Sequence, residues 1–239
     1  MMIALLFTSV ILAFDPVAAG DAAFERERYD EAIRCYQSAL NSAPLDAGSQ
    51  WKLARAIVCR ADVSPEAEQP AAYRAALQAA EKSLALDPHS SSAHTWYAIS
   101  LGYVAIGEGV RSQIRIAHRI KAEVAEAIRL DASNDVAYSI QGTLFRNLGN
   151  VGWMERQLAG VLIGRLPDGG YPEAEQALRK AVTLAPGVIR HRYELGLLYL
   201  DWGKNDEARV TFRDALTLKP VIASDKQRIA DMTKRLQKL

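Results

Sequence analysis

Two segments near opposite ends of the chain share one pattern of small and large residues, and this pattern restricts the fold more than any other feature. Within AGDAAFERERYDEAIRCYQSALNSAP and YELGLLYLDWGKNDEARVTFRDALTLKP, two alanines stand seven residues apart with an aromatic residue between them. These residues are Ala32, Tyr36 and Ala39, and then Ala208, Phe212 and Ala215. Seven residues make two helical turns, so each set lies on one helix face. Small residues there let a second helix approach closely, while the ring fills the remaining space.

Three more helix pairs are predicted between these two segments, with longer connections. Their first helices are SQWKLARAIVCR, SSAHTWYAISLGYVAIG and NDVAYSIQGTLFRNLG. Gly203 follows the first helix of the last pair, where a left-handed residue ends a helix at little cost. We therefore predict an all-α fold, an α-solenoid of about five helix pairs over residues 20–239. An inserted helix is expected at about 151–165, and a C-terminal capping helix at about 222–238.

The regular units resemble the tetratricopeptide repeat, and the irregular ones resemble a narrower family. The segments WKLARA, LALDPHSSSAHTWYAI, GWMERQLAGVLIG and YPEAEQALRKAVTLAP occur in the order typical of the regulator of microtubule dynamics family, over residues 29–239. In that family a Trp-x-x-Arg stretch opens an inserted helix before the second helix of the fourth repeat. The resemblance implies a helical-repeat adaptor, here an exported, bacterial-type relative. Eukaryotic members are named for microtubules and linked to mitochondrial or endoplasmic-reticulum membranes.

The N-terminus favours export. The stretch MMIALLFTSVILAF carries no charged side chain and is shorter than the roughly 20 residues that span a bilayer. It fits the apolar region of a signal peptide over residues 1–19, with a small-residue cleavage site before Gly20. We therefore expect a periplasmic or otherwise exported protein. Retention as an N-terminal membrane anchor is the first alternative, and a buried N-terminal helix is the second.

Charge and cysteine content exclude several classes of function. Lys and Arg number 29 against 28 Asp and Glu, and no segment concentrates base, so nucleic acid is not an expected partner. Cys35 and Cys59 lack the spacing of a zinc site, and we interpret both as small buried residues, with a disulfide as the alternative. The histidines are scattered. We expect no metal and no cofactor.

The first helix of each pair usually lines the concave face of such a stack, and this gives the candidate binding residues. Trp51 and Arg55 are four apart, His94 and Tyr97 are three apart, and Arg146 lies near the end of the next first helix. Together they predict an aromatic and basic groove suited to an acidic or C-terminal peptide. The alternative is structural: the rings pack between layers, Arg55 pairs with an internal carboxylate, and His94 hydrogen-bonds within the helix array.

The inserted helix supplies three more candidates, which are Trp153, Glu155 and Arg156. The four apolar residues Met154, Leu158, Val161 and Leu162 share one face, and charge is confined to the first turn. Because the rest of this helix is apolar, we expect it to be buried, docked in or across the concave groove. Glu155 and Arg156 would then contact polar groups such as Arg55, His94 or Arg146.

Two functional classes remain open. The first is a non-catalytic scaffold that binds a protein or peptide partner in its concave groove. The second is a small-ligand binder or enzyme that uses a pocket closed by the inserted helix. The sequence contains no nucleophile–base pair, phosphate loop or cofactor fingerprint. We therefore expect no enzymatic activity.

Overall fold

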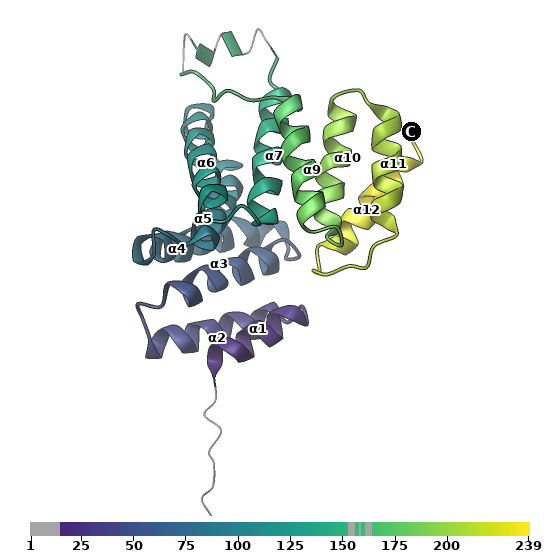
Figure 1. Cartoon of the computed structure of the whole chain (residues 1–239). Coiled ribbons are helices and arrows are strands. Elements are labelled where there is room, and N and C mark those ends of the chain that lie inside the picture. Colours follow the sequence, from purple (N-terminus) through teal and green to yellow (C-terminus); the bar gives the residue numbers. More distant parts are fainter. Residues whose placement is uncertain (1–14, 153–155, 158, 161–163) are drawn as a thin grey trace, which may run out of the picture.

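The computed structural model describes residues 15–152, 156–157, 159–160 and 164–239, and within these ranges it contains helices and no strand (Figure 1). The helices are α1 (Pro16–Glu25), α2 (Tyr29–Ser42), α3 (Ala47–Ala61), η1 (Glu66–Glu68), α4 (Gln69–Leu86), α5 (Ser91–Ala105), α6 (Val110–Leu130), α7 (Asp135–Gly149), α9 (Tyr171–Leu184), α10 (Ile189–Asp201), α11 (Asn205–Leu216) and α12 (Asp225–Leu236). Extensive contacts join α1 to α2, α3 to α4, α5 to α6, α7 to α9 and α10 to α11. The predicted solenoid of five pairs with a C-terminal cap is thus confirmed.

Side-chain caps fix where the first helices of four pairs begin. The carboxylate of Asp15 accepts hydrogen bonds from the first turn of α1, and that of Asp46 does the same for α3. The hydroxyl of Ser90 and the side-chain oxygen of Asn134 accept bonds from α5 and α7. Each cap satisfies amide groups that have no partner inside the helix.

The small and large residues of the repeat pattern form the core as expected. Tyr36, Phe212, Ala32 and Ala208 are fully buried. Gly196 on α10 faces Phe212 on α11 so closely that a Cβ atom there would stand 2.3 Å from the ring. Gly203 has a φ of +76°, which confirms the predicted left-handed end of α10.

The C-terminal segment closes the stack by touching the first repeat. The hydroxyl of Tyr29, at the start of α2, accepts a hydrogen bond of 3.0 Å from the amide of Ala223. Lys226 Nζ lies 3.6 Å from Glu27 Oε2. The carboxylate of Asp225 holds the turn itself, because it accepts bonds from the amides of residues 221 and 222. We call residues 221–228 the C-terminal latch, a feature that the sequence analysis did not predict.

The predictions for the N-terminus and for the two cysteines can be compared with the structure. Residues 1–14 lie outside the described residues, and Pro16–Ala19 belong to α1. No helix in the described part of the chain combines the length and apolar character that crossing a bilayer requires. Cys35 and Cys59 are free thiols; Cys59 is buried, as expected, whereas Cys35 is only half-buried.

Candidate binding site

Trp51 and Arg55 lie together on α3, but Arg55 is engaged by the first repeat. Its Nη2 is 3.6 Å from Asp21 Oδ1, and its guanidinium stacks 3.9 Å from the ring centroid of Phe24 and 5.2 Å from that of Trp51. Burial acts to raise the pKa of Asp21, but the hydrogen bond from Lys52 and the nearby charges lower it overall. The structure therefore matches the alternative in which Arg55 pairs with an internal carboxylate.

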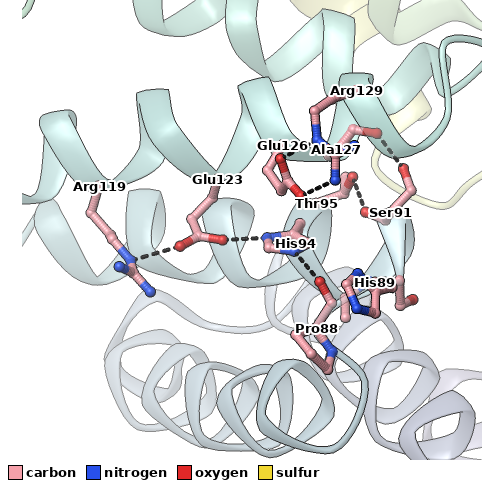
Figure 2. Close-up of polar contacts among 12 residues, drawn as sticks. Pro88, His89, Ser91, His94, Thr95, Arg119, Glu123, Glu126, Ala127 and Arg129 are labelled. Carbon is pink, nitrogen blue, oxygen red and sulfur yellow. Dashed lines mark hydrogen bonds and ion pairs between the residues drawn. The ribbon is translucent and has the colours of Figure 1, made fainter.

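His94 and Tyr97 face α6 rather than the residues of α3. Figure 2 shows His94 between two oxygen acceptors: Nδ1 lies 2.5 Å from Glu123 Oε2, and Nε2 lies 2.9 Å from the carbonyl of Pro88. Arg119 Nε approaches the other oxygen of Glu123 at 2.7 Å, and its guanidinium lies over the ring of Tyr97. Carbonyl and carboxylate oxygens accept hydrogen bonds, so each ring nitrogen of His94 faces an acceptor. His94 thus ties α5 to α6 and to the preceding turn, as the structural alternative expected.

This contact gives a first stability prediction. Replacing Glu123→Gln removes the charge between His94 and Arg119 while keeping the side-chain shape. We expect the free energy of unfolding to fall by about 1–3 kcal/mol, because a buried hydrogen bond to a charged group is lost. Chemical denaturation followed by circular dichroism measures the change. The control is Glu126→Gln, whose carboxylate pairs with Arg129 at the surface and should leave the midpoint unchanged. Equal effects from the two variants would contradict a structural role for the pair.

The remaining candidate arginines have partners elsewhere. Arg146 lies between two carboxylates of α10, 3.5 Å from Glu194 and 3.7 Å from Asp201. Arg156 donates to backbone carbonyls at the end of α7 and before α9, including that of Gly169 at 3.2 Å and that of Leu148. The expectation that Arg156 would contact Arg55, His94 or Arg146 was wrong, because the chain on either side of the insertion supplies nearer acceptors.

The inserted segment is described only in part. Trp153 and Glu155 lie outside the described residues, as do the four residues of the predicted apolar face. Residues 156, 157, 159 and 160 are helical. The loop after them is held on α6 by two contacts. Lys121 Nζ donates to the carbonyl of Asp168 at 2.7 Å, and His118 Nε2 lies 2.7 Å from the carbonyl oxygen of Arg165.

A buried histidine that the sequence analysis left unassigned joins α7 to α10. His191 is fully buried, and its Nε2 donates to Asp135 Oδ2 at 2.7 Å. Its Nδ1 has no hydrogen-bond partner among the described residues. Burial lowers the pKa of His191 below its ordinary value of 6.5, although the bond to Asp135 acts in the opposite direction.

Acid is therefore expected to destabilise the fold through His191. Below pH 6.5 the unfolded chain binds a proton at this residue, whereas the folded chain does not until its lower pKa is reached. The stability that neutral His191 contributes is fully present above pH 6.5. It is lost as pH falls from 6.5 to the lower pKa of the folded state, with a slope of at most about 1.4 kcal/mol per pH unit. Denaturation at pH 7.5, 6.5 and 5.5 should show this slope, and His191→Gln should flatten it. An unchanged slope in the variant would assign the effect to other groups.

Three adjoining cavities run along the inside of the closed stack, and together we call them the inner groove. The central cavity, of about 330 Å³, is lined by α3, α5, α7, α10 and the C-terminal latch. An apolar cavity of about 640 Å³ extends from it towards α6 and the inserted segment. A third, of about 360 Å³, extends towards α1. Each volume lies in the usual range of ligand sites, about 300–1,000 Å³.

Shared wall residues show that these cavities adjoin one another. The central and apolar cavities share Gly102, Ile106, Ile120, Leu144 and Asn147. The central and third cavities share Cys59, Trp96, Arg190 and Ile222. Of the predicted site residues, Trp51 and Arg55 line the third cavity. They are the predicted residues that lie on the inner groove. Ala159 lines the apolar cavity, so the inserted segment contributes to one wall.

Four charged side chains line the central cavity, and three of them have close partners. Arg228 pairs with Asp225 at 3.0 Å, and Glu194 pairs with Arg146. Asp62 accepts a bond of 3.1 Å from the hydroxyl of Tyr73, and burial raises its pKa. Burial also raises the pKa of the Cys59 thiol to about 12, so it remains protonated and unreactive.

The fourth charged side chain, Arg190, interacts electrostatically with Asp62 and Asp135 but has no closer partner in the described part of the chain. Its Nε is buried and has no hydrogen-bond partner among the described residues, nor does Arg190 form an ion pair with any of them. The buried hydroxyl of Ser139, on the wall of the same cavity, also has no partner among those residues. Unpaired buried polar groups are rare in folded proteins, and each calls for an explanation.

This polar wall of α7 was not predicted, although the sequence carries a signal for it. Ser139, Thr143 and Asn147 are four residues apart on α7 and all line the central cavity. That spacing places polar side chains on one face of a helix otherwise rich in apolar residues. Within the described ranges, no three His, Cys, Asp or Glu side chains gather as a metal site requires.

Comparison with known proteins identifies the family. The sequence model of Regulator of microtubule dynamics protein 1-3 matches residues 17–239. The chain belongs to the regulator of microtubule dynamics family. The predicted resemblance is therefore confirmed over almost the whole chain.

The relatives that this chain matches are longer proteins. Regulator of microtubule dynamics protein 2 of Homo sapiens is 28% identical over 191 residues, which cover 79% of this chain and 47% of the human protein. Protein 3 of Xenopus laevis is 27% identical over 179 residues, covering 74% of this chain and 39% of that protein. The chain thus spans about half the length, or less, of the relatives it matches.

Solved structures confirm the fold. The crystal structure of a thermophilic tetratricopeptide-repeat protein from Thermus thermophilus superposes with a TM-score of 0.69. The match covers 93% of this chain and 97% of that one at 20% sequence identity. This member of the regulator of microtubule dynamics family is therefore a tetratricopeptide-type solenoid.

Proposed function

We propose that this chain is a non-catalytic binding module that holds an extended peptide segment of a partner protein in its inner groove. The observation that carries the proposal is the groove wall on α7, where Ser139 and Asn147 stand beside apolar surface. Peptide backbone carries a donor and an acceptor at nearly every residue, so a bound segment needs polar side chains along its path. The solenoid fold and the family support a scaffold for protein interaction.

The proposal is tested by blocking the groove without disturbing the core. Asn147 is exposed and lines both the central and the apolar cavity, so Asn147→Trp should fill the groove and leave the fold intact. Gln176→Trp, on an exposed position of α9, is the matched control. A random 12-residue peptide library is panned on the wild type, and the selected peptides are measured by calorimetry. We expect Asn147→Trp to weaken their binding at least tenfold and Gln176→Trp to leave it unchanged. Failure to enrich any peptide, or equal binding to both variants, would refute the proposal.

A small apolar ligand is the second candidate, and the apolar cavity of about 640 Å³ is the observation that favours it. Native mass spectrometry of the purified chain separates the two candidates. A mass shift from a retained small molecule that disappears in Asn147→Trp would favour the small ligand. An unshifted mass together with peptide binding favours the proposal.

We also propose that the chain is exported and processed before Gly20. A cut after Ala19 would remove the Asp15 cap and the first turn of α1, but it would keep Gly20, which packs against the ring of Tyr36. N-terminal sequencing of the mature protein from its host should therefore start at Gly20. A start at Met1 would favour the N-terminal anchor instead. The free energy of unfolding of a chain of residues 20–239 should be about 0.5–2 kcal/mol lower than that of a chain of residues 15–239, because the cap is lost.

A further inference from the structure

We infer that Arg190 binds a carboxylate of the peptide held in the inner groove, and that the apolar side chains preceding this carboxylate lie in the apolar cavity. The inference rests on the proposed peptide-binding function and specifies the chemistry of its ligand. The peptide would be apolar in its last residues and would end in, or next to, a carboxylate.

The pattern of ion pairs in the groove points to an anion at Arg190. The other arginine of the central cavity, Arg228, is neutralised by the buried carboxylate of Asp225. The acid nearest to Arg190 in sequence, Glu194, is held by Arg146 and by the hydroxyl of Thr143. Asp62 and Asp135 interact electrostatically with Arg190, but neither forms an ion pair with it. Arg190 is therefore the one arginine of this cavity without an ion-pair partner among the described residues.

The shape of the guanidinium suits a carboxylate. Arginine presents parallel N–H groups that match the two oxygens of a carboxylate, and such paired bonds are among the strongest in proteins. Arg190 lines both the central and the third cavity, so it stands where these two spaces meet. The unpaired hydroxyl of Ser139 lies on the wall of the central cavity and can donate a further bond to the ligand.

The apolar cavity indicates what precedes the carboxylate. It opens from the central cavity beside Leu144 and Asn147 and is lined mainly by α5, α6 and α7. Ile114 and Leu148 in its wall are buried, which gives an apolar surface for aliphatic or aromatic side chains. A ligand that extends from Arg190 into this space therefore places a charge at one end and apolar groups behind it.

The polar face of α7 favours a peptide over a hydrocarbon chain. An acyl chain would cover the exposed amide of Asn147 and leave the buried hydroxyl of Ser139 without a partner, and both effects oppose binding. A peptide main chain supplies partners for both side chains. The carboxylate can come from the C-terminus or from an Asp or Glu side chain, since both offer the same pair of oxygens.

The test uses three fluorescein-labelled heptapeptide pools on the whole chain, measured by fluorescence anisotropy. Each begins Gly-Ser-Gly and has equimolar Leu, Ile, Val and Phe at the next three positions. The first pool ends in Ala with a free carboxylate, the second in Ala amide, and the third in Glu amide. We expect the first or the third pool to bind at least tenfold more tightly than the second. In Arg190→Gln this preference should vanish while binding of the Ala amide pool is unchanged, and Arg190→Lys should restore it in part.

Each outcome decides between specific alternatives. Tight binding of the first pool alone identifies a C-terminal carboxylate, and tight binding of the third identifies an acidic side chain; both support the inference. Equal binding of all three pools by the wild type overturns the role of Arg190 but leaves the peptide-binding function standing. Binding of no pool overturns both. Dansyl-undecanoate that binds through Arg190 more tightly than the peptides would replace the peptide with a fatty-acyl ligand.

A stability measurement separates a ligand-binding arginine from a structural one. An arginine that held the fold through ion pairs would lower the melting temperature when removed. Arg190 has no such partner among the described residues, so Arg190→Gln should melt at the wild-type temperature or slightly above it. A clear fall in melting temperature would contradict the inference.

Discussion

Replacement of Gly196→Val is expected to lower the free energy of unfolding by about 3 kcal/mol, because it overpacks the contact between α10 and α11. A Cβ atom at this position would lie 2.3 Å and 2.5 Å from two ring carbons of Phe212. The ring is fully buried, so it cannot turn away into solvent. The helices would have to separate, and the neighbouring alanines would then lose their contacts. Thermal unfolding followed at 222 nm should show a fall of about 6–12 °C for a chain of this size.

Two further variants make this prediction specific. Gly187→Ala lies where an added Cβ meets nothing within 4 Å, and it should melt like the wild type. Combining Gly196→Val with Phe212→Leu should recover part of the loss, since the smaller side chain leaves room for the added methyl groups. If Gly196→Val alone is as stable as Gly187→Ala, the two helices do not need a glycine at this contact.

The fold could be predicted because its determinants are local in the sequence. Gly196 and Phe212 belong to consecutive helices, and the residues that let these helices approach are visible as a spacing of small and large side chains. The same arrangement recurs in the first repeat, where a Cβ on Gly20 would lie 2.6 Å from the ring of Tyr36. Contacts of this kind repeat with the pattern, so the number and order of helix pairs follow from it.

The candidate site was harder to predict, because periodicity does not tell which neighbour a helix face meets. His94 and Tyr97 do share one side of α5, but that helix is packed against α3, α4, α6 and α7, and seven of its first ten residues are buried. No exposed face was left to mark the concave side. Both residues turned to α6, where Glu123 and Arg119 supply the complementary charges.

The closure of the stack could not be predicted from any local pattern. Tyr29 and Ala223 are 194 positions apart, and their contact depends on the small rotations between helix pairs, summed over the whole array. Arg190 became recognisable only once this closure had defined a central cavity. The polar spacing of Ser139, Thr143 and Asn147, by contrast, was open to prediction from sequence.

Release of the C-terminal latch is the second large effect expected, and Asp225→Ala should produce it. The carboxylate of Asp225 is fully buried and accepts bonds from the amides of Val221 and Ile222 and from Arg228. Its removal leaves three donors without their acceptor, one of them charged. We expect a loss of about 3–5 kcal/mol, concentrated in the latch and α12. Native-state hydrogen exchange measures it as faster exchange of the amides of residues 221–223.

Tyr29→Phe separates the closure of the stack from the folding of the turn. This variant removes the acceptor of the Ala223 amide and leaves Asp225 and its bonds in place. Exchange should therefore rise at Ala223 and stay slow at Val221 and Ile222, whereas Asp225→Ala should raise all three. Asp214→Ala, which changes an exposed acid on α11, is the control and should change none of them.

Because Ile222 and Arg228 line the central cavity, release of the latch also opens the inner groove. Peptides bound there should then dissociate faster from both latch variants, and unchanged dissociation would mean that the latch is not part of the binding site.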